Sequence, residues 1–329
     1  MRRRFRALCA ILVCSTLLTG CWPFKKKKST PSGGGGTSSA TSGPANLAVT
    51  GASKALSRVT SNPVDELWPV LSADGKTLLL TARGDAEQVI VGVNPNAGSS
   101  RTVYTSAKAR SGAPDWLPSG KSFVFVSNAM GAFSLVRALS SSPNAAISVV
   151  VNGDNAPAID FPSVSPDGSR VAFQMGPAGS TQIGAADLSG GNFTMLTEGE
   201  TPAFSPDGKR IAFTRAVGGV SQLFLIDAED GGNLVQVTSG DADCSMPSWS
   251  PDGNLLLFSS NRGYDKFPGA SKDSTWNLYL IRPDGEGLTQ LTDGARWSYA
   301  PHWGADGWIY FSTNDAGNFD VWRLKYAGE

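Results

Sequence analysis

Met246-Pro-Ser-Trp-Ser-Pro-Asp-Gly253 is one of six copies of a short segment that decides the fold. The other copies are Trp68-Pro-Val-Leu-Ser-Ala-Asp-Gly75, Ala113-Pro-Asp-Trp-Leu-Pro-Ser-Gly120, Phe161-Pro-Ser-Val-Ser-Pro-Asp-Gly168, Thr201-Pro-Ala-Phe-Ser-Pro-Asp-Gly208 and Ala300-Pro-His-Trp-Gly-Ala-Asp-Gly307. Their first prolines, at positions 69, 114, 162, 202, 247 and 301, are spaced by 45, 48, 40, 45 and 54 residues. A four-stranded propeller blade has this period, about 40–50 residues.

Each copy reads as a strand followed by a tight turn. Ser-Pro-Asp-Gly places proline at the second turn position and glycine where a positive φ is cheapest. An apolar strand without alternation comes next, such as Val171-Ala-Phe173 or Leu255-Leu-Leu-Phe258, which indicates burial on both faces. A third strand and a short outer strand, such as Val235-Gln-Val-Thr238, complete the unit. The sequence therefore predicts an all-β, six-bladed β-propeller.

The last repeat ends near Leu324 without an outer strand of its own. A matching piece, Ser57-Arg-Val-Thr60, stands before the first repeat. We expect this N-terminal strand to pair into the last blade and close the ring, which removes a free sheet edge.

The repeats resemble those of TolB-type propellers, relatives of the WD-repeat fold, over about residues 54–326. Asn261-Arg262-Gly263 is also similar to a Ser-x-Arg-x-Gly segment of that family. The resemblance implies a TolB-like propeller lipoprotein that binds another envelope protein. Two features differ from TolB. TolB carries an α/β domain ahead of its propeller, for which this chain has no room, and this chain carries a lipidation signal.

Residues 1–20 are interpreted as a lipoprotein signal peptide. Four arginines precede an apolar run at residues 7–18, which is too short to span a bilayer. Leu18-Thr19-Gly20-Cys21 resembles a lipobox, so Cys21 is the predicted lipidation site and membrane lipid a predicted partner. Residues 21–46, basic and then Gly/Ser-rich, are a predicted flexible tether before a propeller at residues 47–329. Position 22 is Trp, whereas Asp at this position marks retention in the inner membrane of enteric bacteria. This favours an outer-membrane location, with the protein facing the periplasm or the surface.

The formal net charge of zero hides an acidic body. Residues 1–46 contain eight basic residues and no acid, which leaves 20 basic and 28 acidic residues in the remainder, a net charge of −8. A phosphate backbone is attracted by the opposite sign, so the composition argues against a nucleic-acid partner.

The loops that join an outer strand to the next inner strand gather around one channel mouth in a propeller. Here they hold carboxylates at Asp65, Glu66, Asp154, Asp160, Glu198, Glu200, Asp241, Asp243 and Asp293, opposed by Lys108, Arg110 and Arg296. The partner-binding residues predicted from these loops are Asp65, Glu66, Trp68, Asp160, Glu200, Asp243, Arg296, Trp297 and Tyr299. They favour an acidic rim for a basic peptide, a protein segment or a cation, although ordinary loop polarity explains the same residues.

The sequence offers little support for catalysis. His302 is the single histidine, no nucleophile-elbow motif is present, and one histidine with Cys244 does not make a zinc site. Cys244 is expected to be a buried, unreactive thiol. We therefore predict a binding scaffold for an envelope protein or peptide, not an enzyme, with no cofactor and no metal. The alternatives are a surface receptor for a glycan or peptide and a hydrolase or lyase built on carboxylates.

Overall fold

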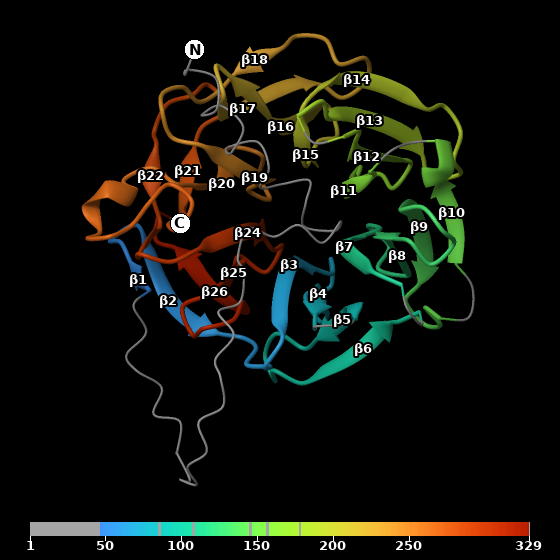
Figure 1. Cartoon of the computed structure of the whole chain (residues 1–329), viewed down its shortest axis with the longest axis horizontal. Coiled ribbons are helices and arrows are strands. Elements are labelled where there is room, and N and C mark those ends of the chain that lie inside the picture. Colours follow the sequence, from blue (N-terminus) through green and yellow to red (C-terminus); the bar gives the residue numbers. More distant parts are fainter. Residues whose placement is uncertain are drawn as a thin grey trace, which may run out of the picture.

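The computed structural model describes residues 47–84, 87–106, 109–144, 147–155, 158–177 and 179–328. In this part the chain forms 26 strands and two short 3₁₀ helices, η1 (Gly153–Asn155) and η2 (Tyr264–Lys266). Six four-stranded sheets radiate from a common axis as the blades of a propeller (Figure 1). The all-β, six-bladed prediction is confirmed. The predicted signal peptide, Cys21 and the tether lie outside the described residues, as does Lys108.

The strands follow one another outward from the axis in each blade. Blade 1 contains β3 (Asp65–Leu71), β4 (Leu78–Arg83), β5 (Gln88–Val93) and β6 (Ser100–Tyr104). Blade 2 contains β7 (Ser111–Trp116), β8 (Ser122–Ser127), β9 (Ser134–Leu139) and β10 (Ile147–Val151). Blade 3 contains β11 (Asp160–Val164), β12 (Arg170–Met175), β13 (Gln182–Asp187) and β14 (Thr194–Glu198).

The remaining blades complete the ring. Blade 4 contains β15 (Glu200–Phe204), β16 (Arg210–Val217), β17 (Val220–Asp227) and β18 (Val235–Gln236). Blade 5 contains β19 (Cys244–Trp249), β20 (Leu256–Ser260), β21 (Asn277–Ile281) and β22 (Thr289–Gln290). Blade 6 contains β24 (Ser298–Trp303), β25 (Ile309–Thr313), β26 (Asp320–Tyr326) and β2 (Ser53–Arg58). A further pair joins β1 (Ala48–Val49) to β23 (Thr292–Asp293).

The core lies between neighbouring blades, where the second strands are buried on both faces. Val124 and Val126 of β8 pack with Val171 and Phe173 of β12, and all four side chains are fully buried. Burial of this kind stabilises the fold by roughly 1.5–3 kcal/mol per large apolar side chain. The unbroken apolar runs in the sequence are therefore explained by the stacking of blades.

Three threonines, Thr60, Thr238 and Thr292, lie at equivalent places near the ends of outer strands. Thr238 Oγ1 accepts the backbone N–H of Leu223 at 2.9 Å, and Thr292 Oγ1 accepts that of Leu278 at 2.9 Å. Thr60 Oγ1 does the same for Val321 at 2.9 Å. In each case a side-chain hydroxyl takes the place of a backbone carbonyl at the end of the sheet ladder.

The N-terminal strand β2 pairs antiparallel with β26 and is the outer strand of blade 6 (Figure 1). Ser57 lies opposite Arg323 and Arg58 opposite Trp322. The strand covers residues 53–58 rather than the expected 57–60. Beyond it, the backbone N–H groups of Val59 and Thr60 both donate to the carbonyl oxygen of Val321 in β26, at 2.8 and 3.2 Å. Arg58 also forms an ion pair of 2.7 Å with Asp320, whose side chain is fully buried.

Every inner strand bulges at the repeated proline. The residues before these prolines all have a positive φ: Trp68, Ala113, Phe161, Thr201, Met246 and Ala300, with φ between 47° and 55°. Residues before proline normally stay extended, so six equivalent exceptions mark a structural device of the repeat. Neighbouring blades help to hold it, since Thr81 Oγ1 accepts the N–H of Ala113 and Gln174 Oε1 accepts that of Thr201.

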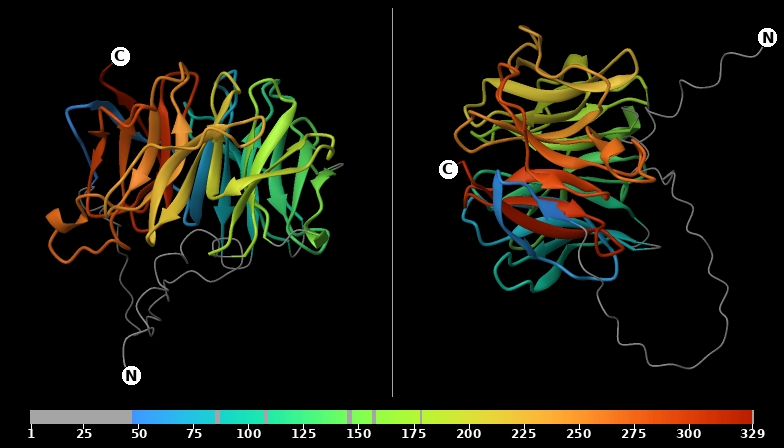
Figure 2. Two further views of the ribbon diagram at one scale, coloured as in Figure 1. Left: turned by 90° about the horizontal axis from the view of Figure 1, so that it is seen from above. Right: turned by 90° about the vertical axis from the view of Figure 1, so that its left-hand side faces the viewer.

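The disc has two faces, which the strands cross from one side to the other (Figure 2). The face that bears the blade-to-blade connections and the loops between second and third strands is here called the mouth face. We call the turn face the one that bears the repeated Asp-Gly turns. In those turns the aspartates are held locally: Ser205 Oγ donates to Asp207 Oδ1 at 2.6 Å, which lowers the pKa of Asp207.

Candidate functional site

Two hollows lie within the ring, separated by a buried aromatic cluster. The cluster contains Trp68, Phe161 and Met246, which line the hollow on the turn face. It also contains Trp276, Trp297 and Tyr299, which line the hollow on the mouth face. The inner-strand bulges thus place large side chains across the channel and divide it in two.

The hollow on the mouth face, here the mouth pocket, has a volume of about 290 Å³. It is lined by residues of blades 3 to 6, among them Glu198, Glu200, Asp243 and Asp273. Arg215 is the one lysine or arginine among its described lining residues, and it lies 3.5 Å from Glu198. The pocket therefore carries an excess of negative charge.

Two of its carboxylates are held in fixed positions. Thr181 donates its hydroxyl to Glu200 Oε1 at 2.9 Å, and burial raises the pKa of Glu200. Asp243 accepts the backbone N–H of Ser221 at 2.9 Å and the side-chain amide of Asn261 at 2.9 Å. Such hydrogen bonds orient a carboxylate before any ligand arrives.

The aromatic side chains form the floor of this pocket rather than exposed anchors. Trp297 is 4% exposed and Tyr299 is 3% exposed. The Trp297 ring lies 5.2 Å from that of Tyr299 and 5.6 Å from that of Trp276, between centroids. Trp276 was missed in the sequence, where only its place directly before an apolar strand distinguishes it.

The pocket gathers four of the residues predicted from the sequence: Glu200, Asp243, Trp297 and Tyr299. Asp65 forms an ion pair with Arg83 at 3.1 Å. Glu66 is buried, and the side-chain amide of Asn62 donates a hydrogen bond to its Oε1. Asp160 is buried and accepts the N–H of Phe161, and its pKa is raised by desolvation.

Two other predicted residues lie at different hollows. Trp68 lines the hollow on the turn face. Arg296 is exposed and lines a third hollow with Phe267, from the loop between β20 and β21, and Asn314. The nine predicted residues therefore do not form one site.

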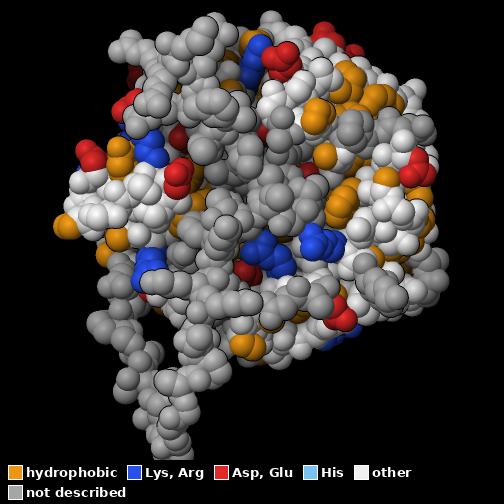
Figure 3. All heavy atoms as spheres, in the orientation of Figure 1, with side chains coloured by type: hydrophobic (Ala, Val, Ile, Leu, Met, Phe, Trp, Pro, Cys, Tyr) orange, Lys and Arg blue, Asp and Glu red, His pale blue; other side chains and the backbone are white. Residues whose placement is uncertain are grey.

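The loops between second and third strands share the mouth face and add charges of both signs. Among the described residues they carry Arg262, Lys266 and Lys272, and also Glu87, Asp265, Asp273 and Asp315. Figure 3 shows lysine and arginine side chains near the middle of this face and acidic side chains spread around them.

Cys244 also lines the mouth pocket, with 1% of its surface exposed. Burial raises the pKa of its thiol to about 11, so the thiolate is not populated near neutral pH. The expected burial of Cys244 is confirmed.

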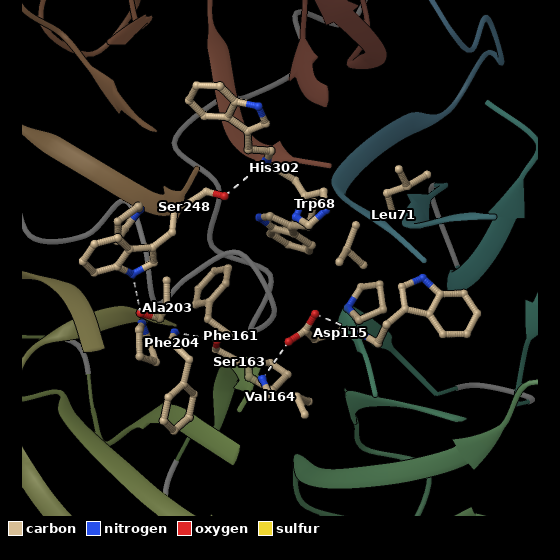
Figure 4. Close-up of a pocket in the computed structure, with 18 of the residues that line it drawn as sticks. Trp68, Leu71, Asp115, Phe161, Ser163, Val164, Ala203, Phe204, Ser248 and His302 are labelled. Atoms are coloured by element: carbon tan, nitrogen blue, oxygen red, sulfur yellow. Dashed lines mark hydrogen bonds between the residues drawn. The ribbon is translucent and has the colours of Figure 1, made fainter. Parts of the chain in front are cut away.

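The hollow on the turn face, here the funnel, has a volume of about 420 Å³ and is lined by all six blades (Figure 4). The repeated prolines form much of its wall, and the turn residues Ala73, Pro166 and Ala305 reach its outer edge. Asp115 and His302 are the two titratable residues among those that line it. Burial lowers the pKa of His302 to about 4, which leaves the imidazole neutral at pH 7.

Two further features are absent from the part of the chain that the structure describes. No helix in this part has the length and apolar character required to cross a bilayer. No group of three or more His, Cys, Asp or Glu side chains in this part is arranged to hold a metal ion.

No family model matches the sequence. A stretch of 81 residues, 24% of this chain, is 30% identical to the uncharacterized protein Atu1656 of Agrobacterium fabrum. That stretch covers 24% of Atu1656, so the sequence match spans about a quarter of either protein.

Solved structures share the fold. TolB from Acinetobacter baumannii has a TM-score of 0.63 and 22% identity, over 75% of this chain and 59% of that chain. A putative TolB from Agrobacterium tumefaciens has a TM-score of 0.59 and 19% identity, over 82% and 92%. Oligogalacturonate lyase from Vibrio parahaemolyticus has a TM-score of 0.53 and 13% identity, over 85% and 96%. The chain thus has a TolB-like β-propeller fold, which is shared with an enzyme.

Proposed function

We propose that this chain is a lipid-anchored envelope protein whose propeller binds a segment of another protein at the mouth pocket. The observation that carries the proposal is the pocket itself. Glu200 and Asp243 are oriented by hydrogen bonds over an aromatic floor, with one arginine among the described lining residues. A basic side chain of a partner fits this charge, and the buried rings supply a rigid apolar surface.

Two of the pocket's carboxylates are held by hydrogen bonds, and a fixed carboxylate suits the binding of a basic side chain. Glu200 is bonded to Thr181, and Asp243 to Ser221 and Asn261. The likeness to a lyase rests on the fold alone and assigns no reacting group to this chain.

The membrane anchor is supported by the lipobox at residues 18–21 and by the position of Cys21 after the apolar run. Cys21→Ala is expected to abolish acyl labelling and to leave an uncleaved precursor, because the thiol is the attachment point for diacylglycerol. Metabolic labelling with a fatty-acid analogue, followed by membrane fractionation, measures both. Cys244→Ala is the matched control, and normal maturation of Cys21→Ala would contradict the anchor.

Binding at the mouth pocket is tested by charge reversal, after the partner has been captured by crosslinking in the native envelope. Glu200→Lys with Asp243→Lys is expected to weaken binding about ten-fold or more, because like charges then face each other. Binding by the native chain should also fall with salt, since the Debye length drops from about 30 Å at 0.01 M to about 8 Å at 0.15 M.

The control for this test reverses the same number of charges on the turn face. Glu229→Lys with Asp230→Lys changes two exposed residues in the turn between β17 and β18. If this pair weakens binding and the pocket pair does not, the partner docks on the other face.

A further inference from the structure

The funnel on the turn face has an apolar wall that holds a single charged group. Its described lining residues include no lysine and no arginine. His302 is neutral near pH 7, so Asp115 supplies the formal charge of the cavity. A carboxylate in such surroundings is costly, and burial raises the pKa of Asp115 to about 7.

The fold does not require a carboxylate at this position. Asp115 Oδ2 accepts the N–H of Val164 in the next blade at 2.7 Å. Ser163 makes the same bond to Phe204 at 3.0 Å, and Ser248 makes it to Trp303 at 3.3 Å. A serine hydroxyl therefore joins blades in the same way without the desolvation of a charge. The second oxygen of Asp115, Oδ1, accepts the N–H of Trp116 at 2.9 Å, and each carboxylate oxygen keeps a further lone pair for a ligand.

The side chains around Asp115 are those that bind organic cations. Trp68 and Phe161 lie in the adjacent blades, with ring centroids 5.5 Å apart and nearly perpendicular planes. Figure 4 shows the Asp115 carboxylate and these two rings around the same central space. Aromatic faces attract cations, and a carboxylate adds a charge-assisted hydrogen bond to an ammonium group.

The chemistry of the cavity selects the class of ligand. A metal ion such as Ca²⁺ needs several converging oxygens, and a single carboxylate does not provide them. The volume of about 420 Å³ lies within the range of small-molecule sites. We propose that the funnel is a second ligand site, which binds a small organic ammonium ion with its charge at Asp115 and its apolar part against Trp68 and Phe161.

The proposal is tested by calorimetry with benzylammonium and its neutral analogue benzyl alcohol at about pH 8, where the Asp115 carboxyl is ionised. We expect benzylammonium to bind with a Kd of roughly 1 mM or tighter, and benzyl alcohol more weakly. Asp115→Asn and Asp115→Ser should each weaken benzylammonium binding about ten-fold or more and leave benzyl alcohol unaffected. The serine variant keeps the hydroxyl acceptor that blades 3 and 5 use, so it preserves the joint if the asparagine variant does not fold.

Two further measurements separate this site from the mouth pocket. Glu200→Gln, which removes a half-buried carboxylate of the mouth pocket, should leave benzylammonium binding unchanged. Binding should weaken from about pH 8 to about pH 6, because Asp115 becomes protonated and neutral while His302, already uncharged, does not titrate in this range. Equal binding of amine and alcohol, unchanged affinity in both Asp115 variants, or the absence of binding at about 10 mM amine would overturn the proposal.

Discussion

Removal of residues 1–60 is expected to lower the Tm by at least about 10 °C, whereas removal of residues 1–46 leaves it unchanged. The longer deletion removes β1 and β2, exposes the edge of β26, and takes Leu47 and Leu56 away from the core of blade 6. It also leaves Asp320 buried without Arg58. Together these losses are on the order of 5 kcal/mol.

Thermal unfolding of the two purified truncations, each with the same added N-terminal residue, provides the measurement. The shorter truncation is the control because it keeps every described residue. Equal Tm values for the two proteins would show that the ring holds without its N-terminal strand.

Gly199→Ala is expected to destabilise the protein by roughly 2–4 kcal/mol and to abolish partner binding at the mouth pocket. Gly199 lies between Glu198 and Glu200, with a φ of 158°. A Cβ there would lie 2.4 Å from the ring of Phe213 and 2.9 Å from the carbonyl oxygen of Thr214. Phe213 is fully buried, so the backbone that carries both glutamates must move instead.

Urea unfolding and the binding assay measure the two effects. Gly191→Ala is the matched control, because a Cβ at that position meets no atom closer than 3.8 Å. A Gly199→Ala protein with native stability and native affinity would mean that this connection adapts without disturbing the pocket.

The blades were predictable because one local signal, the strand and turn around each repeated proline, recurs at a period that admits few folds. The buried second strands followed from the same signal, since runs such as Val171-Ala-Phe173 do not alternate. The end of the N-terminal strand was less predictable. Val59 and Thr60 both donate their backbone N–H groups to the same carbonyl, that of Val321, and a sequence pattern does not show where regular pairing ends in this way.

The sites were predicted only in part, because a residue's place in the repeat does not give its exposure. Glu200 and Asp160 occupy the same position before the proline, yet Glu200 lines the mouth pocket and Asp160 is buried. The funnel was missed, although the sequence held a signal for it: Asp115 follows its proline where the other copies have Val70, Ser163, Ala203, Ser248 and His302. The role of Asp115 depends on the neighbouring blade, where Val164 donates its backbone N–H to the Asp115 carboxylate.

The pairing of β1 and β2 determines how the ring responds to mechanical tension. A pull on the chain before Leu47 first loads the β1–β23 pair, in which Ala48 lies opposite Asp293. It then loads the bonds from the Thr50 and Ser53 hydroxyls to the carbonyls of Gln290 and Leu291, and only afterwards the β2–β26 ladder. These contacts are loaded one after another, and when the C-terminus is held they pass the force through blades 5 and 6 without crossing blades 1 to 4. Stretching from the N-terminus should therefore open the ring at blade 6 and leave the opposite blades folded.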